Sequence, residues 1–182
     1  RVWNVDTGEC ILTLKGHTAY VLSVGFNHDG TKIVSGSWDN TIRVWNVDTG
    51  ECILILKGHT NDVTSVGFNH DGTKIVSGSD DETIRVWNVD TGECILTLKG
   101  HTSFVTSVGF NHDGTKIVSG SADETIRVWN VDTGECILTL KGHTGTVTSV
   151  GFNHDGTKIV SGSEDNTIRV WNVDTGECIL TL

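Results

Sequence analysis

Short runs of alternating apolar and polar residues follow one another along the whole chain, and tight-turn residues separate them. The runs are rich in β-branched and aromatic residues, and no apolar spacing of about 3.6 residues occurs, which predicts strands rather than helices. The pair Asp29-Gly30 is a strong signal for a tight hairpin, because such turns need residues at positive φ. Within residues 15–56 we expect four short antiparallel strands, at Tyr20–Phe26, Lys32–Ser37, Thr41–Val47 and Glu51–Leu56.

The strand pattern repeats with a fixed period of 42 residues, which is the spacing of the tryptophans at positions 3, 45, 87, 129 and 171. A period of about 20–50 residues indicates a repeat architecture instead of a single core. Both faces of each expected sheet carry apolar or small side chains, so each sheet needs a neighbour on either side. Four-stranded sheets stacked around a channel form a β-propeller. The predicted units are residues 15–56, 57–98, 99–140 and 141–182, preceded by residues 1–14, which repeat the letters of residues 169–182.

Three short motifs in every repeat resemble those of a WD40 blade. In the first repeat they are Gly16-His17, Ser35-Gly36-Ser37-Trp38-Asp39 and Trp45-Asn46, and their spacing agrees in all four copies. Two positions depart from the family pattern: Asn46 and its copies replace the Asp of a Trp-Asp pair, and His28 and its copies replace a proline in the first hairpin turn. The resemblance implies an all-β fold of four full WD40 blades, with residues 1–14 as the outer two strands of a partial blade.

Each repeat also carries a His, a Ser and an Asp, the residue types of a hydrolase triad. The resemblance implies that they instead bond in a chain to the indole N–H of the repeat's tryptophan, which satisfies buried polar groups and fixes the turns. Catalysis needs one asymmetric pocket with an oxyanion hole, which four identical sets do not supply, so we expect no enzymatic activity. The expected networks are His17, Ser35, Asp39 and Trp45; His59, Ser77, Asp81 and Trp87; His101, Ser119, Asp123 and Trp129; and His143, Ser161, Asp165 and Trp171.

A second histidine series lies in the first hairpin turns, at His28, His70, His112 and His154. A ring of histidines could bind a metal in principle, but each zinc ligand has to lie about 2.0–2.1 Å from the ion. Successive copies belong to separate blades, so we interpret them as solvated turn residues. The Asp-Thr-Gly turns lack the spaced acidic ligands of a calcium loop. We therefore expect neither a metal nor a cofactor.

The four full repeats are identical at 36 of their 42 positions, and five of the six variable positions cluster. They fall at the start of the first strand and at the turn between the second and third strands, which share one end of an antiparallel sheet. In the family, this end carries the usual protein-binding surface. The aromatic residues outside the repeated scaffold all lie at variable positions, and exposed aromatics are typical interface anchors. We predict a recognition face formed by Tyr20, Leu22, Trp38, Asn40, Asp62, Asp80, Glu82, Phe104, Glu124 and Glu164.

The side chains on this face indicate which partner it fits. The first blade offers aromatic and apolar groups, and the second offers Asp62, Asp80 and Glu82 beside them. We expect a protein or peptide that presents an apolar residue next to basic ones. The predicted function is a non-enzymatic binding scaffold. The alternative is a purely structural self-assembling unit, natural or engineered, without a specific ligand.

Charge and cysteine placement exclude other classes of function. The chain has 23 acidic and 13 basic residues and no cluster of Lys and Arg, so we expect no nucleic-acid partner. No apolar run is long enough to span a membrane, so we expect no membrane partner either. The cysteines occupy one equivalent position per repeat and face neighbouring blades rather than each other. We expect free thiols and a reducing, cytoplasmic environment for Cys10, Cys52, Cys94, Cys136 and Cys178.

Four blades are too few for a closed ring of this kind, because the family resemblance points to rings of roughly six to nine blades. An open arc exposes apolar blade faces at both ends, and two-fold association would cover both at once. We expect a homodimer of eight or nine blade equivalents. Residues 1–14 are the open point, since the last blade already has its own fourth strand. They either rearrange, pair with a partner chain, or mark missing upstream sequence.

Overall fold

The structure, a computed structural model, describes residues 1–182 without a gap and consists of 18 strands joined by turns. It has no helix of the length and apolar character that crossing a membrane would require. The strands are β1 (Val2–Trp3), β2 (Cys10–Leu12), β3 (Val21–Phe26), β4 (Lys32–Ser37), β5 (Thr41–Asn46), β6 (Cys52–Lys57), β7 (Val63–Phe68), β8 (Lys74–Ser79), β9 (Ile84–Asn88), β10 (Cys94–Leu98), β11 (Val105–Phe110), β12 (Lys116–Ser121), β13 (Thr125–Asn130), β14 (Cys136–Lys141), β15 (Val147–Phe152), β16 (Lys158–Ser163), β17 (Ile168–Asn172) and β18 (Cys178–Thr181).

Consecutive strands pair antiparallel in four four-stranded sheets, which we call blades 1 to 4. Blade 1 comprises β3–β6, blade 2 comprises β7–β10, blade 3 comprises β11–β14 and blade 4 comprises β15–β18. Strands β1 and β2 form a separate two-stranded sheet, the half-blade. The expectation of an all-β chain with four such sheets and a two-strand partial sheet is confirmed.

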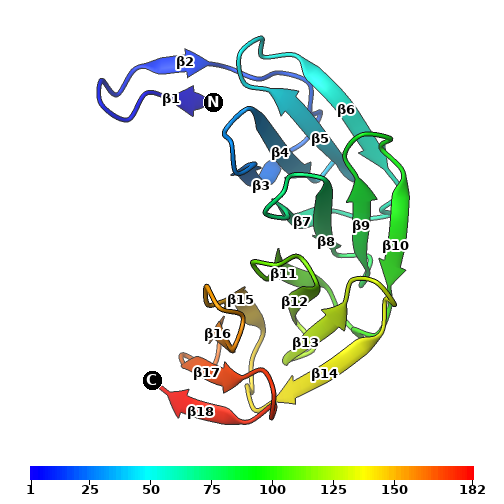
Figure 1. Ribbon diagram of the computed structural model, residues 1–182, viewed down its shortest axis with the longest axis vertical. Helices are drawn as coiled ribbons and strands as arrows, with labels where there is room; N and C mark the ends of the chain where they lie inside the picture. Colours follow the sequence, from blue (N-terminus) through cyan, green and yellow to red (C-terminus); the bar gives the residue numbers. More distant parts are fainter.

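The blades follow one another around an open arc (Figure 1). Strands β3, β7, β11 and β15 line its inner side, and β6, β10, β14 and β18 lie on its outer side. The half-blade and blade 4 form the two ends of the arc, which do not meet (Figure 1). A single chain therefore leaves the ring open.

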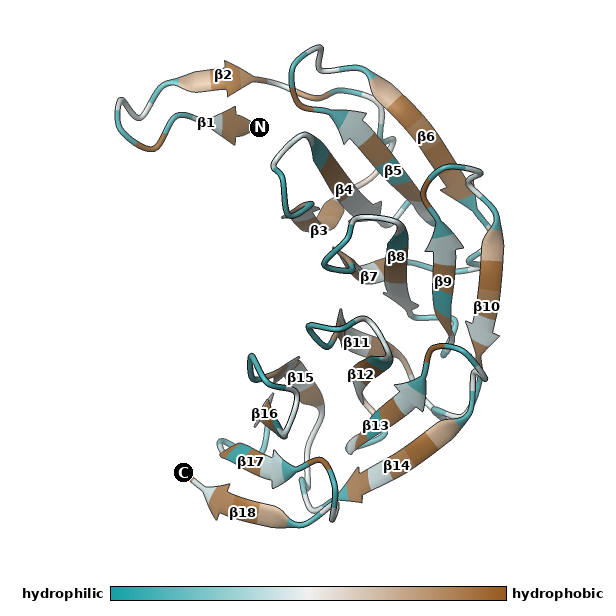
Figure 2. Cartoon of the chain, in the orientation of Figure 1, coloured by the Kyte–Doolittle hydropathy of each residue, from teal (hydrophilic) through white to brown (hydrophobic).

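The hydrophobic core lies between neighbouring blades. Equivalent positions form the cores between blades 2 and 3 and between blades 3 and 4, so one interface is built three times. The strands carry the hydrophobic residues, whereas the turns are mostly hydrophilic (Figure 2). Because both faces of a blade are covered, its strands are apolar on both sides. Between blades 1 and 2 the core residues are Val34, Ile42, Val44 and Leu56 together with Val63, Val66, Ile75, Trp87 and Val89.

A glycine in the second strand allows neighbouring blades to approach closely. A Cβ atom placed on Gly36 would lie 2.7 Å from Cγ1 of Val63, which is closer than packed atoms tolerate. Gly78 meets a valine of blade 3 at the same distance. In blade 4 the equivalent Gly162 has only the Thr148 hydroxyl nearby, at 3.9 Å. The glycine is therefore required by the next blade and not by its own strand.

The half-blade sits on blade 1 as the outer half of a complete blade would. Its Val2, Leu12 and Leu14 pack against Ile33 and Trp45 of blade 1, among other residues. A Cβ placed on Gly50 would lie 3.5 Å from Leu12 of the half-blade. The equivalent glycine of blade 2 lies at the same distance from a leucine of blade 1. Residues 1–14 thus contain a two-stranded sheet that contacts blade 1 at positions equivalent to those where blade 1 contacts blade 2.

Both ends of the arc leave apolar side chains uncovered. In blade 1, Val24 is 67% exposed, whereas its copy Val66 between blades is 7% exposed. In blade 4, Ile168 is 48% exposed, whereas its copy Ile42 is fully buried. Valine and isoleucine are normally interior residues, so the chain presents two unpartnered blade faces.

Candidate functional site

The variable positions lie at one end of the blades, where one backbone hydrogen bond in each blade brings the two groups of positions together. In blade 1 the Trp38 N–H donates to the carbonyl of Tyr20 over 2.9 Å. In blade 2 the Asp80 N–H donates to the carbonyl of Asp62 at the same distance. The residue before the network aspartate therefore stands beside the residue three positions after the network histidine. This pairing makes each blade present two variable side chains as a unit.

Blade 1 presents an exposed aromatic pair. The rings of Tyr20 and Trp38 meet edge to face, with centroids 4.8 Å apart and an interplanar angle of 89°. Tyr20 is 71% exposed and Trp38 is 46% exposed. An edge-to-face contact fixes both rings in place, which lowers the entropy lost when a partner binds. The pair is therefore a pre-organised apolar anchor.

Blade 2, the neighbouring blade, presents uncompensated negative charge at the equivalent positions. Burial raises the pKa of Asp80, and the nearby carboxylates of Asp62 and Asp81 raise it further. No Lys or Arg side chain forms an ion pair with these residues, because every ion pair in the protein joins a histidine to an aspartate. A cationic group from outside would relieve the repulsion between the carboxylates.

The other residues predicted for the recognition face are all accessible. Leu22 and Phe104 are exposed apolar side chains, and Glu82, Glu124 and Glu164 are exposed acidic ones. Asn40 and Asp62 are half-buried. Asn40, Glu82 and Glu124 also have positive φ, between 62° and 66°, which makes them turn residues as well as surface residues.

The four residues of each predicted network lie together in every blade. In blade 2, His59 Nδ1 lies 2.8 Å from Asp81 Oδ2, and its Nε2 lies 2.7 Å from Ser77 Oγ. The indole N–H of Trp87 donates to the same serine oxygen over 2.9 Å. With the imidazole proton on Nδ1, the serine hydroxyl donates to Nε2 and accepts from the indole, so every polar group has a partner. Blades 1, 3 and 4 have the same arrangement.

The network aspartates are held in their charged form. Burial alone would raise the pKa of Asp81, but hydrogen bonds from His59, Thr83 and Thr60 outweigh it and hold the pKa well below its usual range. The pKa values of the copies Asp39, Asp123 and Asp165 are lowered as well. Burial lowers the pKa of His101 against the raising effect of Asp123. In blade 3 the two shifts together favour a neutral imidazole beside a charged carboxylate.

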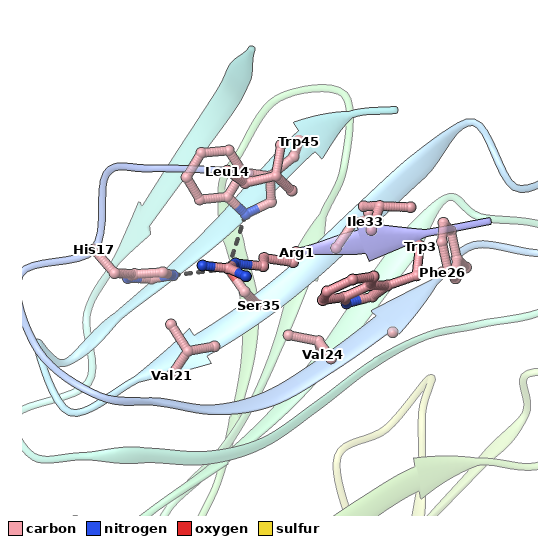
Figure 3. A pocket seen from close by; sticks show the side chains of 12 residues that line it. Arg1, Trp3, Leu14, His17, Val21, Val24, Phe26, Ile33, Ser35 and Trp45 are labelled. Atoms are coloured by element: carbon pink, nitrogen blue, oxygen red, sulfur yellow. Dashed lines mark hydrogen bonds between the residues drawn. The ribbon is translucent and has the colours of Figure 1, made fainter. Parts of the chain in front are cut away.

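This network is unsuited to nucleophilic chemistry even where it borders a cavity. A cavity of about 300 Å³ lies between the half-blade and blade 1, lined by residues that include Trp3, Val24, His17 and Ser35. Figure 3 shows that the ring of His17 and the indole of Trp45 both bond to Ser35. The serine is only 3% exposed and its hydroxyl is engaged on both sides.

The comparison with known families agrees with this geometry. The family model described as "WD domain, G-beta repeat" matches residues 8–46, 50–88, 92–130 and 134–172. These matches cover most of the chain. The chain belongs to the WD40 family. The chain has Trp-Asn where the family pattern has Trp-Asp. This asparagine has a structural role in the blade, because Asn46 Oδ1 accepts the N–H groups of Asp48 and Thr49 and so closes the following turn.

Several known proteins are similar to this chain over about one repeat length. The "Periodic tryptophan protein 2 homolog" of Schizosaccharomyces pombe is 48% identical over 42 residues, which is 23% of this chain and 5% of that protein. The "Ribosome biogenesis protein WDR12 homolog" of Nematostella vectensis is 44% identical over 43 residues, or 22% and 10%. The "Nuclear distribution protein PAC1-2" of Uncinocarpus reesii is 46% identical over 43 residues, or 24% and 9%. The chain thus matches only a small part of each relative's length.

The second histidine series of the WD40 blades is closer together than its sequence positions suggest. The ring centroids of His28 and His70 lie 4.1 Å apart, those of His70 and His112 lie 4.3 Å apart, and those of His112 and His154 lie 4.6 Å apart. No group of three or more His, Cys, Asp or Glu side chains is placed to hold a metal ion. However, the premise that separate blades keep these imidazoles apart is wrong. Their position in the repeat could have predicted these short distances, because they follow the innermost strand of each blade, where neighbouring blades are closest.

A second contact between blades escaped the sequence reasoning. The Thr64 hydroxyl has one proton, which it shares between the carbonyl of Gly78 in its own blade, at 3.0 Å, and that of Val105 in blade 3, at 2.5 Å. Thr106 makes the same pair of bonds between blades 3 and 4. In blade 1 this position is Leu22, which has no hydroxyl to donate. Leu22, which we predicted for the recognition face, therefore leaves the junction between blades 1 and 2 without this hydrogen bond.

Proposed function

We propose that this WD40 chain is a protein-interaction scaffold whose varied face binds a peptide or protein that presents an apolar side chain next to a basic one. The observation that carries the proposal is that the exposed Tyr20–Trp38 pair of blade 1 and the Asp62–Asp80 pair, which no Lys or Arg neutralises, occupy equivalent positions on neighbouring blades. Aromatic anchors supply contact area, and the carboxylates favour lysine or arginine at the adjacent position. The scaffold positions are the same in all blades, so the varied side chains alone determine the choice of partner.

The experiment is a selection of peptides from a random displayed library on the full chain, followed by fluorescence polarisation. We expect the selected peptides to carry a basic residue adjacent to an apolar one. Trp38→Ala and Asp80→Ala should each weaken binding by roughly tenfold or more, as expected for residues at the centre of an interface. Binding should also weaken with rising salt, because exposed charges are screened.

The matched control is Asp90→Ala. Asp90 is an exposed aspartate of the same blade, in the turn between β9 and β10 at the opposite end of the sheet. This variant removes the same charge and should leave binding unchanged. Binding that persists after Trp38→Ala and Asp80→Ala are combined would refute the proposed recognition face.

A second candidate function is self-association, and the two open blade faces favour it. The face of blade 4 presents the residue types that each inner blade uses toward its successor, and the face of blade 1 presents those used toward a predecessor. A second copy is therefore a partner of fitting chemistry for both ends. Two chains joined head to tail at both junctions would form a ring of eight blades. This is the homodimer expected from the sequence.

The half-blade competes with this association. Residues 1–14 have the same sequence as residues 169–182 and contact blade 1 as those residues of a second copy would. The two segments compete for one place, so an eight-blade ring forms only when the half-blade leaves. The Leu14→Asp change should loosen the half-blade and increase the dimer fraction.

Sedimentation velocity tests self-association. The full chain should show a species of twice its 19.6 kDa mass, and either Val24→Asp or Val160→Asp should return it to the monomer. Val5→Asp, at a residue that is 97% exposed, is the control without effect. A mixture of the Val24→Asp and Val160→Asp chains retains one intact junction and should form an open dimer. A monomer at every concentration would contradict self-association and leave peptide binding intact.

We further infer a reducing, cytoplasmic location. All five cysteines are free, and four of them are exposed. Exposed thiols persist as thiols in a reducing compartment. Quantifying free thiols in protein taken from cells under alkylating conditions would test this, with five thiols per chain expected and fewer contradicting it.

A further inference from the structure

We propose that the imidazoles of His28, His70, His112 and His154 form a binding site for divalent transition-metal ions at the end of the blades opposite the varied face. One ion binds between His28 and His70, and a second between His112 and His154. Each ion therefore joins two neighbouring blades. This site is separate from the proposed recognition face and from the histidine networks.

The distances between the rings fit two ligands of one ion. A metal held about 2.0–2.1 Å from each ring nitrogen lies about 3.2 Å from each ring centroid, so two ligands at right angles place their centroids roughly 4.5 Å apart. The observed separations of 4.1 and 4.6 Å within the two pairs are close to this value. Tetrahedral ligands would stand about 5 Å apart, so the geometry favours ions that accept right angles, such as Ni²⁺ and Cu²⁺.

The nitrogen atoms of this row are available, in contrast to those of the networks. None of the four imidazoles forms a hydrogen bond within the protein, and all four are exposed. The neighbouring polar groups are partly engaged: Asn27 Oδ1 accepts the Lys32 N–H over 2.9 Å, and Asp29 Oδ1 accepts from Thr31. The histidine is therefore the side chain of this turn whose polar atoms are all without a hydrogen-bond partner in the protein.

The spaces between successive turns are polar and open enough to hold a hydrated ion. The space between the first two turns measures about 260 Å³ and that between the last two about 330 Å³. Asn, His, Asp and Gly residues alone line both of them. The second carboxylate oxygens of Asp71 and Asp155 have no hydrogen-bond partner and add negative charge nearby. With two protein ligands per ion, water completes the coordination shell, as is common for exposed sites.

Titration calorimetry with Ni²⁺ on the full chain tests the proposal. Ni²⁺ is preferred over Cu²⁺ because the chain has five free thiols that Cu²⁺ would oxidise. The expected stoichiometry is two ions per chain. Two double variants with equal histidine content discriminate the pairing. His28→Gln with His70→Gln leaves the proposed pair His112 and His154, whereas His70→Gln with His112→Gln leaves the separated imidazoles of His28 and His154.

The first variant should retain one Ni²⁺ ion, and the second should bind at least roughly tenfold more weakly, because a second ligand held nearby acts at high effective concentration. Both variants keep every cysteine and every network histidine, so binding elsewhere contributes equally to both. Both should fold, because the changed side chains are exposed and unbonded. Equal Ni²⁺ binding by the two variants, or no binding by the unaltered chain, would overturn the proposal.

Discussion

Blades 1 and 2 have nearly the same sequence but different surroundings. Val66 and His59 of blade 2 are buried against blade 1, whereas Val24 of blade 1 is exposed and His17 is half-buried beside a cavity. Within each blade the strand register and the hydrogen-bond network are the same. The difference shows that each blade makes its own hydrogen bonds but receives its hydrophobic core from a neighbour. Substitutions at equivalent positions can separate these two contributions.

The largest effect is expected at Ile42, which is buried between blades 1 and 2, whereas its copy in blade 4, Ile168, is exposed. Ile42→Ala removes a fully buried side chain between blades 1 and 2 and should lower the free energy of unfolding by about 2–5 kcal/mol. Ile168→Ala, the same change at the open face of blade 4, should cost less than about 1 kcal/mol. Urea unfolding followed by tryptophan fluorescence measures both. Equal costs would show that the blade 4 face is covered in solution.

The network aspartates should behave alike in both blades, because their partners lie within the same blade. Asp81→Ala leaves the Nδ1–H of His59 and the N–H groups of Thr60 and Thr83 without an acceptor, which should cost about 1–3 kcal/mol. Asp39→Ala should cost a similar amount. A much smaller cost for Asp39→Ala in the same unfolding experiment would mean that the network of blade 1 depends on an absent neighbour.

The same carboxylates predict the response to acid. Their pKa values are lower in the folded chain than in the unfolded chain, so the folded state binds fewer protons. Their contribution to stability is fully present above the unfolded pKa of about 3.9 and is lost as pH falls through it toward the folded pKa. Unfolding midpoints measured from pH 6 to pH 2 should therefore fall below about pH 4. The decrease should be shallower in Asp81→Ala.

The close approach of neighbouring blades predicts that the same Gly→Ala substitution has different costs in blade 2 and in blade 4. Gly78→Ala would place a Cβ 2.7 Å from Val105 and should cost about 1–2 kcal/mol by overpacking the junction. Gly162→Ala meets no close atom and should stay within about 0.5 kcal/mol of the unaltered chain. Thermal unfolding of the two variants measures this difference. A cost at Gly162 equal to that at Gly78 would again indicate a covered blade 4.

The smallest expected effect concerns the junction that lacks a hydroxyl. Leu22→Thr should allow the bond that Thr64 makes to the next blade, here toward the Val63 carbonyl, and add about 0.5–1 kcal/mol of stability. Thr64→Leu should remove a comparable amount. Hydrogen exchange at the β3–β7 boundary would report both changes. No gain in Leu22→Thr would show that blade 1 already packs as tightly without the bond.

Much of the fold could be predicted from the sequence because its determinants are local. The Asp-Gly turns and the β-branched runs predicted strands such as β4, whose bounds Lys32–Ser37 are those expected. The predicted first strand began at Tyr20, one residue before the observed Val21. The Tyr20 carbonyl instead accepts the Trp38 N–H at the varied end of the blade. The residues of the candidate site were identified by the variation between copies, since any side chain that differs between otherwise identical blades stands out.

The remaining features depend on the way that the blades stack. Sequence spacing alone placed His28 and His70 on different blades and gave no measure of the distance between them. Their rings stand 4.1 Å apart because the innermost strands converge on the centre of the arc. The edge-to-face contact of Tyr20 with Trp38 likewise needs the turn after β4 to fold back beside the start of β3.

The sequence by itself determined the repeat, the strands, the turns and the composition of each His–Ser–Asp–Trp network, because each of these is set within about 42 residues of chain. Only the tertiary structure decided which apolar faces are covered, and that four turn histidines form a continuous row. These features arise between blades, where identical residues become buried or exposed according to whether a neighbour is present.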